Sequence, residues 1–168
     1  MLNNQTAGQS RCKGASEQAR YPGIQMQYAA ICFREAAGGG DHRIKILLIT
    51  SRDTGRWVIL KGWPMRKKKP YEVASIEAWQ EAGVRGAVRK KVWGSYAYLK
   101  KMKDGQLLHT LVEVHLLHVE EMDSQFPERK QRLLRWFSPA DAASALREPG
   151  LGALLSKLDA CQSRIAVC

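Results

Sequence analysis

Residues 70–82 place the tightest limit on the fold, because they predict one helix between two sets of strands. Pro70 suits the first turn of a helix, where its missing N–H would have no partner, and Gly83 is a natural helix stop. Within this span, apolar residues recur often enough to give the helix a buried side: Val73, Ile76, Ala78 and Ala82. A glycine-containing basic loop, residues 61–69, precedes the helix.

Strands are predicted on both sides of this helix, from runs rich in β-branched and apolar residues. Gly38-Gly39-Gly40-Asp41 indicates a loop joining the first two strands as a hairpin, and Asp104-Gly105 indicates a hairpin turn between two later strands. A bulge is expected at Gly94. The predicted strands span residues 27–34, 44–50, 57–60, 88–99, 107–119 and 134–137, and two further helices span residues 139–146 and 151–161.

This order of elements favours the α/β (α+β) class. Strands and helices do not alternate regularly and no internal repeat is visible, so helices flanking a curved mixed sheet are expected rather than a doubly wound sheet. The chain has 168 residues, which suits one domain. Residues 1–26 are rich in Gln, Asn, Ser, Gly and Ala and are predicted to be a flexible extension, with the domain at 27–168.

Charge and cysteine content narrow the partners and the compartment. Lys plus Arg number 27 against 16 Asp plus Glu, a net charge of +11, which favours a polyanion such as nucleic acid, anionic lipid or a small phosphorylated molecule. No apolar run is long enough to span a bilayer and residues 1–27 have no apolar h-region, so neither a membrane span nor a secretory signal is expected. The four cysteines form no C-x-x-C pair, and Cys32 is expected in the core, so a reducing, cytoplasmic location is predicted.

Glu77 and Glu81 are the clearest candidates for chemistry. Four residues apart, they share one face of the predicted helix. Two carboxylates about 5–6 Å apart repel by roughly 3 kcal/mol at an effective dielectric near 20. A divalent cation turns this repulsion into attraction, and Mg²⁺ favours one or two carboxylates completed by water and phosphates. The alternative is a solvated acidic face on an ordinary helix.

The segment from Gly62 to Val84 resembles the signature of the Nudix hydrolase family, G-x5-E-x7-R-E-U-x-E-E-x-G-U, in which U is apolar. The fixed positions that match are Gly62, Glu77, Glu81 and Gly83, and both Ala78 and Val84 are apolar as the pattern requires. Three fixed positions depart from the pattern: Lys68 and Gln80 replace glutamates, and Ile76 replaces the arginine.

Flanking segments extend the resemblance to roughly residues 27–158. Residues 51–58, 61–64, 81–86 and 135–137 resemble the diphosphoinositol polyphosphate phosphohydrolase branch, which stands close to the dinucleoside polyphosphate hydrolases. The resemblance implies a Nudix-type α/β/α sandwich with a curved mixed sheet, one catalytic loop and helix, and C-terminal helices.

The resemblance also implies roles for individual residues. Glu77 and Glu81 would be catalytic and would hold Mg²⁺ or Mn²⁺, with the Gly62 carbonyl as a further ligand, and Gln80 would position a water. Ser51 and Arg52 would bind substrate phosphates as in the related branch, because arginine binds phosphate bidentately. Arg56 stands beside Arg52 as a leading candidate for binding phosphate, and Lys61 could also reach the substrate.

Other charged residues receive weaker assignments. Glu113, Glu120 and Glu121 are candidates for the additional glutamate that some family members use outside the signature, although a surface position is favoured for each. Residues 66–69, all Arg or Lys, are expected beside the site, where they could steer anions, or else form a solvated charge run. Lys100, Lys101 and Lys103 are interpreted as solubility charges at a hairpin tip.

The expected function is metal-dependent hydrolysis of a phosphoanhydride in a polyphosphorylated metabolite, of the diphosphoinositol polyphosphate or dinucleoside polyphosphate type. An alternative is a catalytically impaired Nudix-fold protein that binds nucleotide or polyphosphate. A second alternative is pyrophosphate removal from RNA 5′ ends, which the charge permits although no RNA-binding motif is found. The expected partner is therefore a small polyanionic substrate, nucleic acid is an alternative that is not favoured, and no membrane partner is expected.

Overall fold

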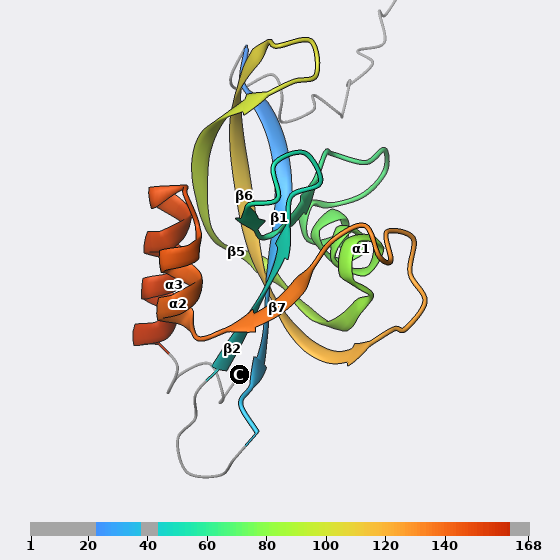
Figure 1. The fold of residues 1–168 in the computed structure, drawn as a ribbon, viewed down its shortest axis with the longest axis vertical. Coiled ribbons are helices and arrows are strands. Elements are labelled where there is room, and N and C mark those ends of the chain that lie inside the picture. Colours follow the sequence, from blue (N-terminus) through green and yellow to red (C-terminus); the bar gives the residue numbers. More distant parts are fainter. Residues whose placement is uncertain (1–22, 38–43, 162–168) are drawn as a thin grey trace, which may run out of the picture.

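The computed structural model describes residues 23–37 and 44–161 (Figure 1). The predicted glycine loop at 38–41, most of the extension at 1–26, Cys12 and Cys168 lie outside these residues. In chain order the elements are β1 (Gln25–Glu35), β2 (Ile44–Thr50), β3 (Trp57–Val58), β4 (Leu60–Gly62), α1 (Pro70–Ala82), β5 (Val84–Lys101), β6 (Leu107–Met122), β7 (Leu134–Phe137), α2 (Pro139–Ala145) and α3 (Pro149–Ala160).

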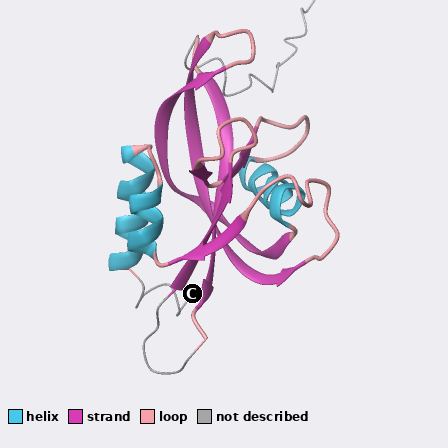
Figure 2. Cartoon of the chain, viewed as in Figure 1, coloured by secondary structure: helices cyan, strands magenta, loops and turns pink. Residues whose placement is uncertain are grey.

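The described strands form one mixed sheet in the order β3-β2-β1-β6-β5, with β4 pairing to β1 and β7 pairing to β2. β1 and β6 run parallel, from the Gln25–Thr110 pair to the Phe33–His118 pair, while the other pairings are antiparallel. Figure 2 shows α1 on one face of the sheet and α2 with α3 on the other. The expected α/β/α sandwich with a mixed sheet is therefore confirmed.

The sheet separates two apolar cores, because successive side chains along a strand point to opposite faces. Ile31 of β1 packs on the face that α2 and α3 cover, together with the buried Leu155. Its neighbours Ala30 and Cys32 pack on the other face, against Ala78 of α1. The buried, free thiol of Cys32 agrees with the core position predicted for it.

The predicted bounds of α1, β2 and β7 agree with the structure, whereas β1, β5 and β6 are longer than predicted. β1 begins at Gln25, two residues before the predicted domain boundary, because Gln25 already pairs with Thr110. β5 begins at Val84 and includes the segment 84–87, which pairs with β6. Most side chains of β5 are half-buried or exposed, so this start has little hydrophobic signal in the sequence.

The single strand predicted at 57–60 is two short strands that bridge different partners. Val58 of β3 pairs with Ile49 of β2, whereas Leu60 of β4 pairs with Ala30 of β1. The first hairpin, the Asp104-Gly105 turn and the irregularity at Gly94 agree with prediction, and the β5–β6 register also shifts at Gly86. None of the helices in the described part of the chain has the length and apolar character that a membrane span requires.

Candidate functional site

Helix α1 is fixed at both ends by local sequence. Pro70 opens it, and the Lys69 N–H donates to the Glu72 carboxylate across 2.7 Å, which satisfies one of the unpaired groups at the N-terminus. Gly83 ends it in the left-handed conformation, at φ 68°. A side chain there would also meet the Asp123 carbonyl oxygen at 2.6 Å.

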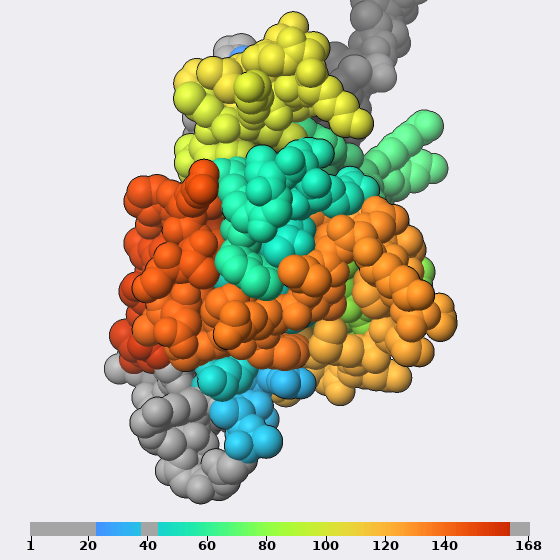
Figure 3. Space-filling view, viewed as in Figure 1, coloured from blue at the N-terminus to red at the C-terminus, as the bar shows by residue number. Residues whose placement is uncertain are grey.

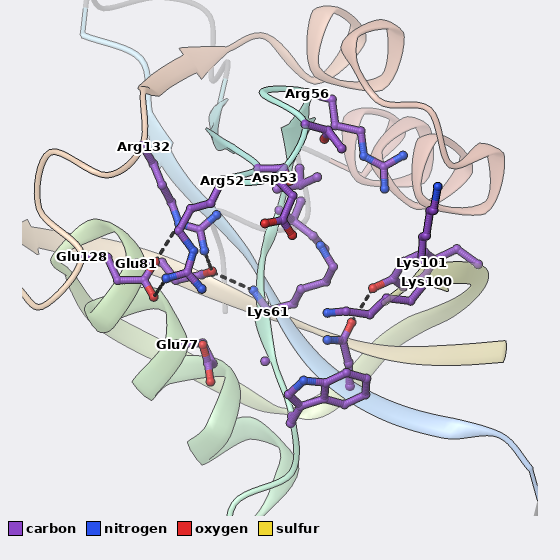
Figure 4. A pocket seen from close by; sticks show the side chains of 18 of the residues that line it. Arg52, Asp53, Arg56, Lys61, Glu77, Glu81, Lys100, Lys101, Glu128 and Arg132 are labelled. Atoms are coloured by element: carbon purple, nitrogen blue, oxygen red, sulfur yellow. Dashed lines mark hydrogen bonds and ion pairs between the residues drawn. The ribbon is translucent and has the colours of Figure 1, made fainter. Parts of the chain in front are cut away.

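The helix forms one wall of a pocket of about 550 Å³. The other walls come from the turn after β2, from β3 and β4, from the C-terminal end of β5 and from the loop between β6 and β7 (Figure 4). The pocket collects the site residues named from the sequence: Ser51, Arg52, Arg56, Lys61, Gly62, Glu77, Gln80 and Glu81.

Glu81 is 6% exposed and both of its carboxylate oxygens accept hydrogen bonds. Oε2 accepts the Lys61 backbone N–H at 3.0 Å, and Oε1 accepts from the Arg132 guanidinium. Burial raises the pKa of Glu81 to about 7, against the opposing effect of Arg132. The strand β4 and the loop before β7 therefore hold this carboxylate in a fixed position.

Glu77, one helical turn earlier, has no hydrogen bond or ion pair within residues 23–37 and 44–161. Burial raises its pKa, and the nearby charge of Glu128 raises it further. Its carboxylate lies directly over Gly62, where a Cβ atom would stand only 1.9 Å from Glu77 Oε1. Glycine at position 62 therefore makes the space in which the Glu77 carboxylate lies.

Arg132 connects the two sides of the pocket, and its side chain is 8% exposed. Its Nε donates to Glu128 at 2.8 Å, its Nη1 to the Thr50 carbonyl at 3.0 Å, and its Nη2 to Glu81. Glu128 also forms an ion pair with Arg52 at 3.2 Å. A continuous series of ion pairs thus runs from Arg52, a predicted phosphate ligand, to the Glu81 carboxylate.

Glu128 and Arg132 were not identified as site residues from the sequence. The glutamate outside the signature that lines the pocket is Glu128, whereas the three candidates named for this role, Glu113, Glu120 and Glu121, do not line it. Glu113 instead lies 3.2 Å from His115. The Glu128–Arg132 spacing of four residues was the available signal, but it lies outside any helix or strand.

The basic residues are also distributed differently from expectation. The loop residues 66–69 do not line the pocket, although they were expected beside it. Lys100 and Lys101 do line it, so their interpretation as solubility charges is wrong; Lys103 lies outside it. The reason is the length of β5, whose C-terminal end passes over the pocket before the hairpin turns.

Burial lowers the pKa of two lysines in the pocket. It lowers the pKa of Lys61 to about 8, although the Glu81 charge opposes the shift, and it lowers the pKa of Lys100 as well. Arg56 is held differently, because it forms an ion pair with Glu148 beside α3 at 3.2 Å.

The acidic end of the pocket suits a hard divalent cation. Glu77 has free carboxylate oxygens, and each Glu81 oxygen keeps a second lone pair beside the hydrogen bond it accepts. The described residues contain no cluster of three His, Cys, Asp or Glu side chains placed to hold a metal ion. Mg²⁺ or Mn²⁺ would therefore be held by Glu77 and Glu81, with the Gly62 carbonyl, water and substrate phosphates as further ligands.

Comparison with known proteins relates this chain to Nudix proteins. The chain matches no protein-family model. It is 29% identical to "Nudix hydrolase 12, mitochondrial" of Arabidopsis thaliana over 109 residues, which are 63% of this chain and 54% of that protein. The match thus spans about half of that relative's length.

Two solved structures agree over most of the chain. A C. elegans Ap4A hydrolase in a binary complex superimposes with a TM-score of 0.60 at 18% identity, over 83% of this chain and 98% of that one. The NUDIX domain of Shewanella oneidensis NrtR complexed with ADP ribose gives 0.57 at 12% identity, over 92% and 95%. Together with the order of elements and the helix that carries Glu77 and Glu81, these likenesses show that the chain has the Nudix fold.

Proposed function

We propose that this protein is a metal-dependent hydrolase of a phosphoanhydride bond in a small polyphosphorylated molecule. The observation that carries the proposal is the pocket itself, which sets the Glu77 and Glu81 carboxylates of α1 against the cations of the turn after β2 and of β4 and β5. Such a division suits a phosphate chain, whose anionic oxygens need cations along their length and a divalent ion at the reacting phosphorus.

The pocket residues would bind phosphate, hold the metal ion and orient the attacking water. Arg52 is about half exposed and lines the pocket with Ser51, so both can bind a phosphate group there. Glu81, fixed by Arg132 and Lys61, and Glu77, free of other partners, would hold the ion. When bound, that ion polarises the phosphoryl group and lowers the pKa of a bound water. Gln80 would orient the water through its amide.

Two substrate types follow from the comparisons and from the resemblance of residues 51–64. One structural neighbour is an Ap4A hydrolase and another binds ADP ribose, so a nucleotide with a phosphate chain is one type. A diphosphoinositol polyphosphate is the other. A reducing, cytoplasmic compartment remains part of the proposal, supported by the free thiols of Cys32 and Cys161.

A second candidate is a protein that binds such a molecule without cleaving it. The observation that favours it is the engagement of both Glu81 oxygens by protein donors, together with an uncharged amide at Gln80. Fewer free anionic ligands weaken the hold on a divalent cation. Removal of pyrophosphate from RNA 5′ ends would use the same chemistry on a larger substrate.

The test is product release from a panel of diadenosine polyphosphates, diphosphoinositol polyphosphates, nucleoside triphosphates, ADP-ribose and 5′-triphosphorylated RNA. Each is incubated with Mg²⁺, Mn²⁺ or EDTA, using the parent protein, Glu81→Gln and Glu120→Gln, whose side chain lies outside the pocket. We expect turnover that requires metal, collapses in Glu81→Gln and persists in Glu120→Gln. Binding without turnover across the panel would favour the second candidate.

A further inference from the structure

We propose that Lys61 and Lys100 form a second phosphate subsite in this pocket, separate from the Glu77–Glu81 end. The substrate would then carry at least one phosphate group beyond the two that the cleaved anhydride bond joins. This inference deepens the proposed function and rests on it for the identity of the reacting bond, but the binding it predicts is measurable without turnover.

The two lysines come from different strands and meet over the pocket. Lys61 lies on β4, and Lys100 lies near the end of β5. Figure 4 shows both side chains reaching into the pocket, with Lys100 entering from the side opposite Glu77, Glu81 and Glu128. Figure 3 shows why they meet, since the end of the β5–β6 hairpin (yellow) rests directly against the segment around residues 50–60 (blue-green).

Aromatic rings support both side chains without neutralising them. The Lys61 Nζ lies 5.8 Å from the centre of the Tyr98 ring, and the Lys100 Nζ lies 4.7 Å from the centre of the Trp63 ring. The Tyr98 hydroxyl donates to the Gln27 amide oxygen at 2.7 Å, which fixes that ring. The ammonium groups are therefore held at the pocket surface.

These lysines differ from the arginines around them because no ion pair among the described residues holds either ammonium group, although the charges of Asp53 and Glu81 act on Lys100 from a distance. Arg52 and Arg132 both pair with Glu128, and Arg56 pairs with Glu148. By contrast, neither ammonium group has an ion pair or hydrogen bond within the part of the chain that the structure describes. Their positive charges are therefore available to a ligand.

The charges of Lys61 and Lys100 repel each other, as the charges of Glu77 and Glu81 do. Both side chains line the same pocket, so their like charges act on each other. A phosphate group between the two ammonium groups would relieve this repulsion and supply acceptors to both. Two like-charged pairs of opposite sign in one pocket suit a cation on the carboxylates and an extra phosphate on the lysines.

The experiment measures binding of inorganic tripolyphosphate and pyrophosphate by calorimetry in EDTA at constant ionic strength. We expect the parent to bind tripolyphosphate more tightly. Loss of one charged hydrogen bond costs about 1.5–3 kcal/mol, so Lys100→Met should lower the ratio of the two affinities roughly tenfold or more. Lys100→Arg, which keeps the charge, should retain most of the ratio.

Lys103→Met is the matched control, because Lys103 is an exposed lysine of the same hairpin that lies outside the pocket. Its affinity ratio should stay within about twofold of the parent, since a distant surface charge is screened. An unchanged ratio in Lys100→Met, or an equal fall in Lys103→Met, overturns the subsite. A chain that shows the lysine dependence but cleaves no polyphosphate keeps the subsite and loses the proposed hydrolase.

Discussion

Arg132 gives Glu81 the cationic partner that the signature segment itself does not contain. The resemblance places an arginine at position 76, where this chain has Ile76. In the structure the guanidinium of Arg132, which lies in a loop 51 residues after Glu81, reaches the same helix and bonds Glu81. The departure at Ile76 therefore does not leave the Glu81 carboxylate without an orienting cation.

Replacing Arg132 by methionine should destabilise the protein strongly. The change would leave the buried Glu81 and the half-buried Glu128 without their main partner, and breaking a buried pair in this way costs about 3–5 kcal/mol. Urea unfolding measures the loss. Arg129→Met removes the same charge from an exposed position of the same loop, and its effect should stay within about 0.5 kcal/mol. Equal losses in the two variants would contradict a specific role for Arg132.

The protonation of Glu81 should make stability depend on pH. Its pKa in the folded chain is raised from an ordinary 4.5 to about 7, so between these values the folded chain holds a proton that the unfolded chain has lost. The contribution of this group to the free energy of unfolding is then fully present below pH 4.5 and is lost as the pH rises through 7.

Urea unfolding in EDTA at several pH values between 5 and 8 checks this expectation. The parent should lose stability relative to Glu81→Gln as the pH rises, because glutamine stays neutral throughout. The comparison with the variant removes the contributions of other titrating groups. Parallel pH profiles for the two proteins would show that Glu81 titrates alike in the folded and unfolded chains.

Helix α1 and strand β4 act together, because the helix supplies the carboxylates and the strand supplies the space for one of them. The sequence identified this helix from Pro70 and Gly83, and its periodicity placed Glu77 and Glu81 on one face. It could not identify Glu128 and Arg132, whose positions depend on how a loop without periodicity returns over the helix. Lys100 was missed for a similar reason, since its role depends on how far β5 extends.

Gly62→Ala should separate activity from folding. The new Cβ would meet the end of the Glu77 side chain, which can move, so the fold should survive while the carboxylate is displaced. Loss of an oriented metal ligand should reduce turnover by about tenfold or more. Thermal unfolding and steady-state kinetics measure the two effects.

Gly152→Ala is the control for this change, because a Cβ there would make only an ordinary contact, at 3.7 Å from the Ala143 carbonyl oxygen. Alanine also favours the interior of α3 over glycine by up to about 1 kcal/mol. This control should keep full turnover. If Gly62→Ala also kept it, the packing of Glu77 over Gly62 would have no part in catalysis.

The sandwich as a whole was predictable because the order of strands and helices, the single central helix and the buried strand β2 all carry strong local signals. The mixed character of the sheet depends on the parallel pairing of β1 with β6, which joins segments about 85 residues apart along the chain and has no local signal. That pairing brings the β5–β6 hairpin alongside β4 and so builds the basic side of the pocket.

Only some of the basic residues that give the chain its net charge of +11 line this pocket. The loop residues 66–69 lie outside its lining, while Lys61, Lys100 and Lys101 lie within it. A high net positive charge attracts polyanions at a distance, whereas the pocket cations select among them. This distribution of charge supports the small phosphorylated substrate that we propose.

The most direct measurement of the central claim is the kcat/KM of the parent and of Glu77→Gln with Mg²⁺, on the best substrate of the panel. No hydrogen bond or ion pair among the described residues holds the Glu77 carboxylate, so its replacement should leave the fold intact. We predict a loss of kcat/KM of about a hundredfold, in line with the loss of a metal-holding carboxylate, with polyphosphate binding in EDTA retained. Unchanged turnover in Glu77→Gln would contradict the assignment of this pocket as the hydrolytic site.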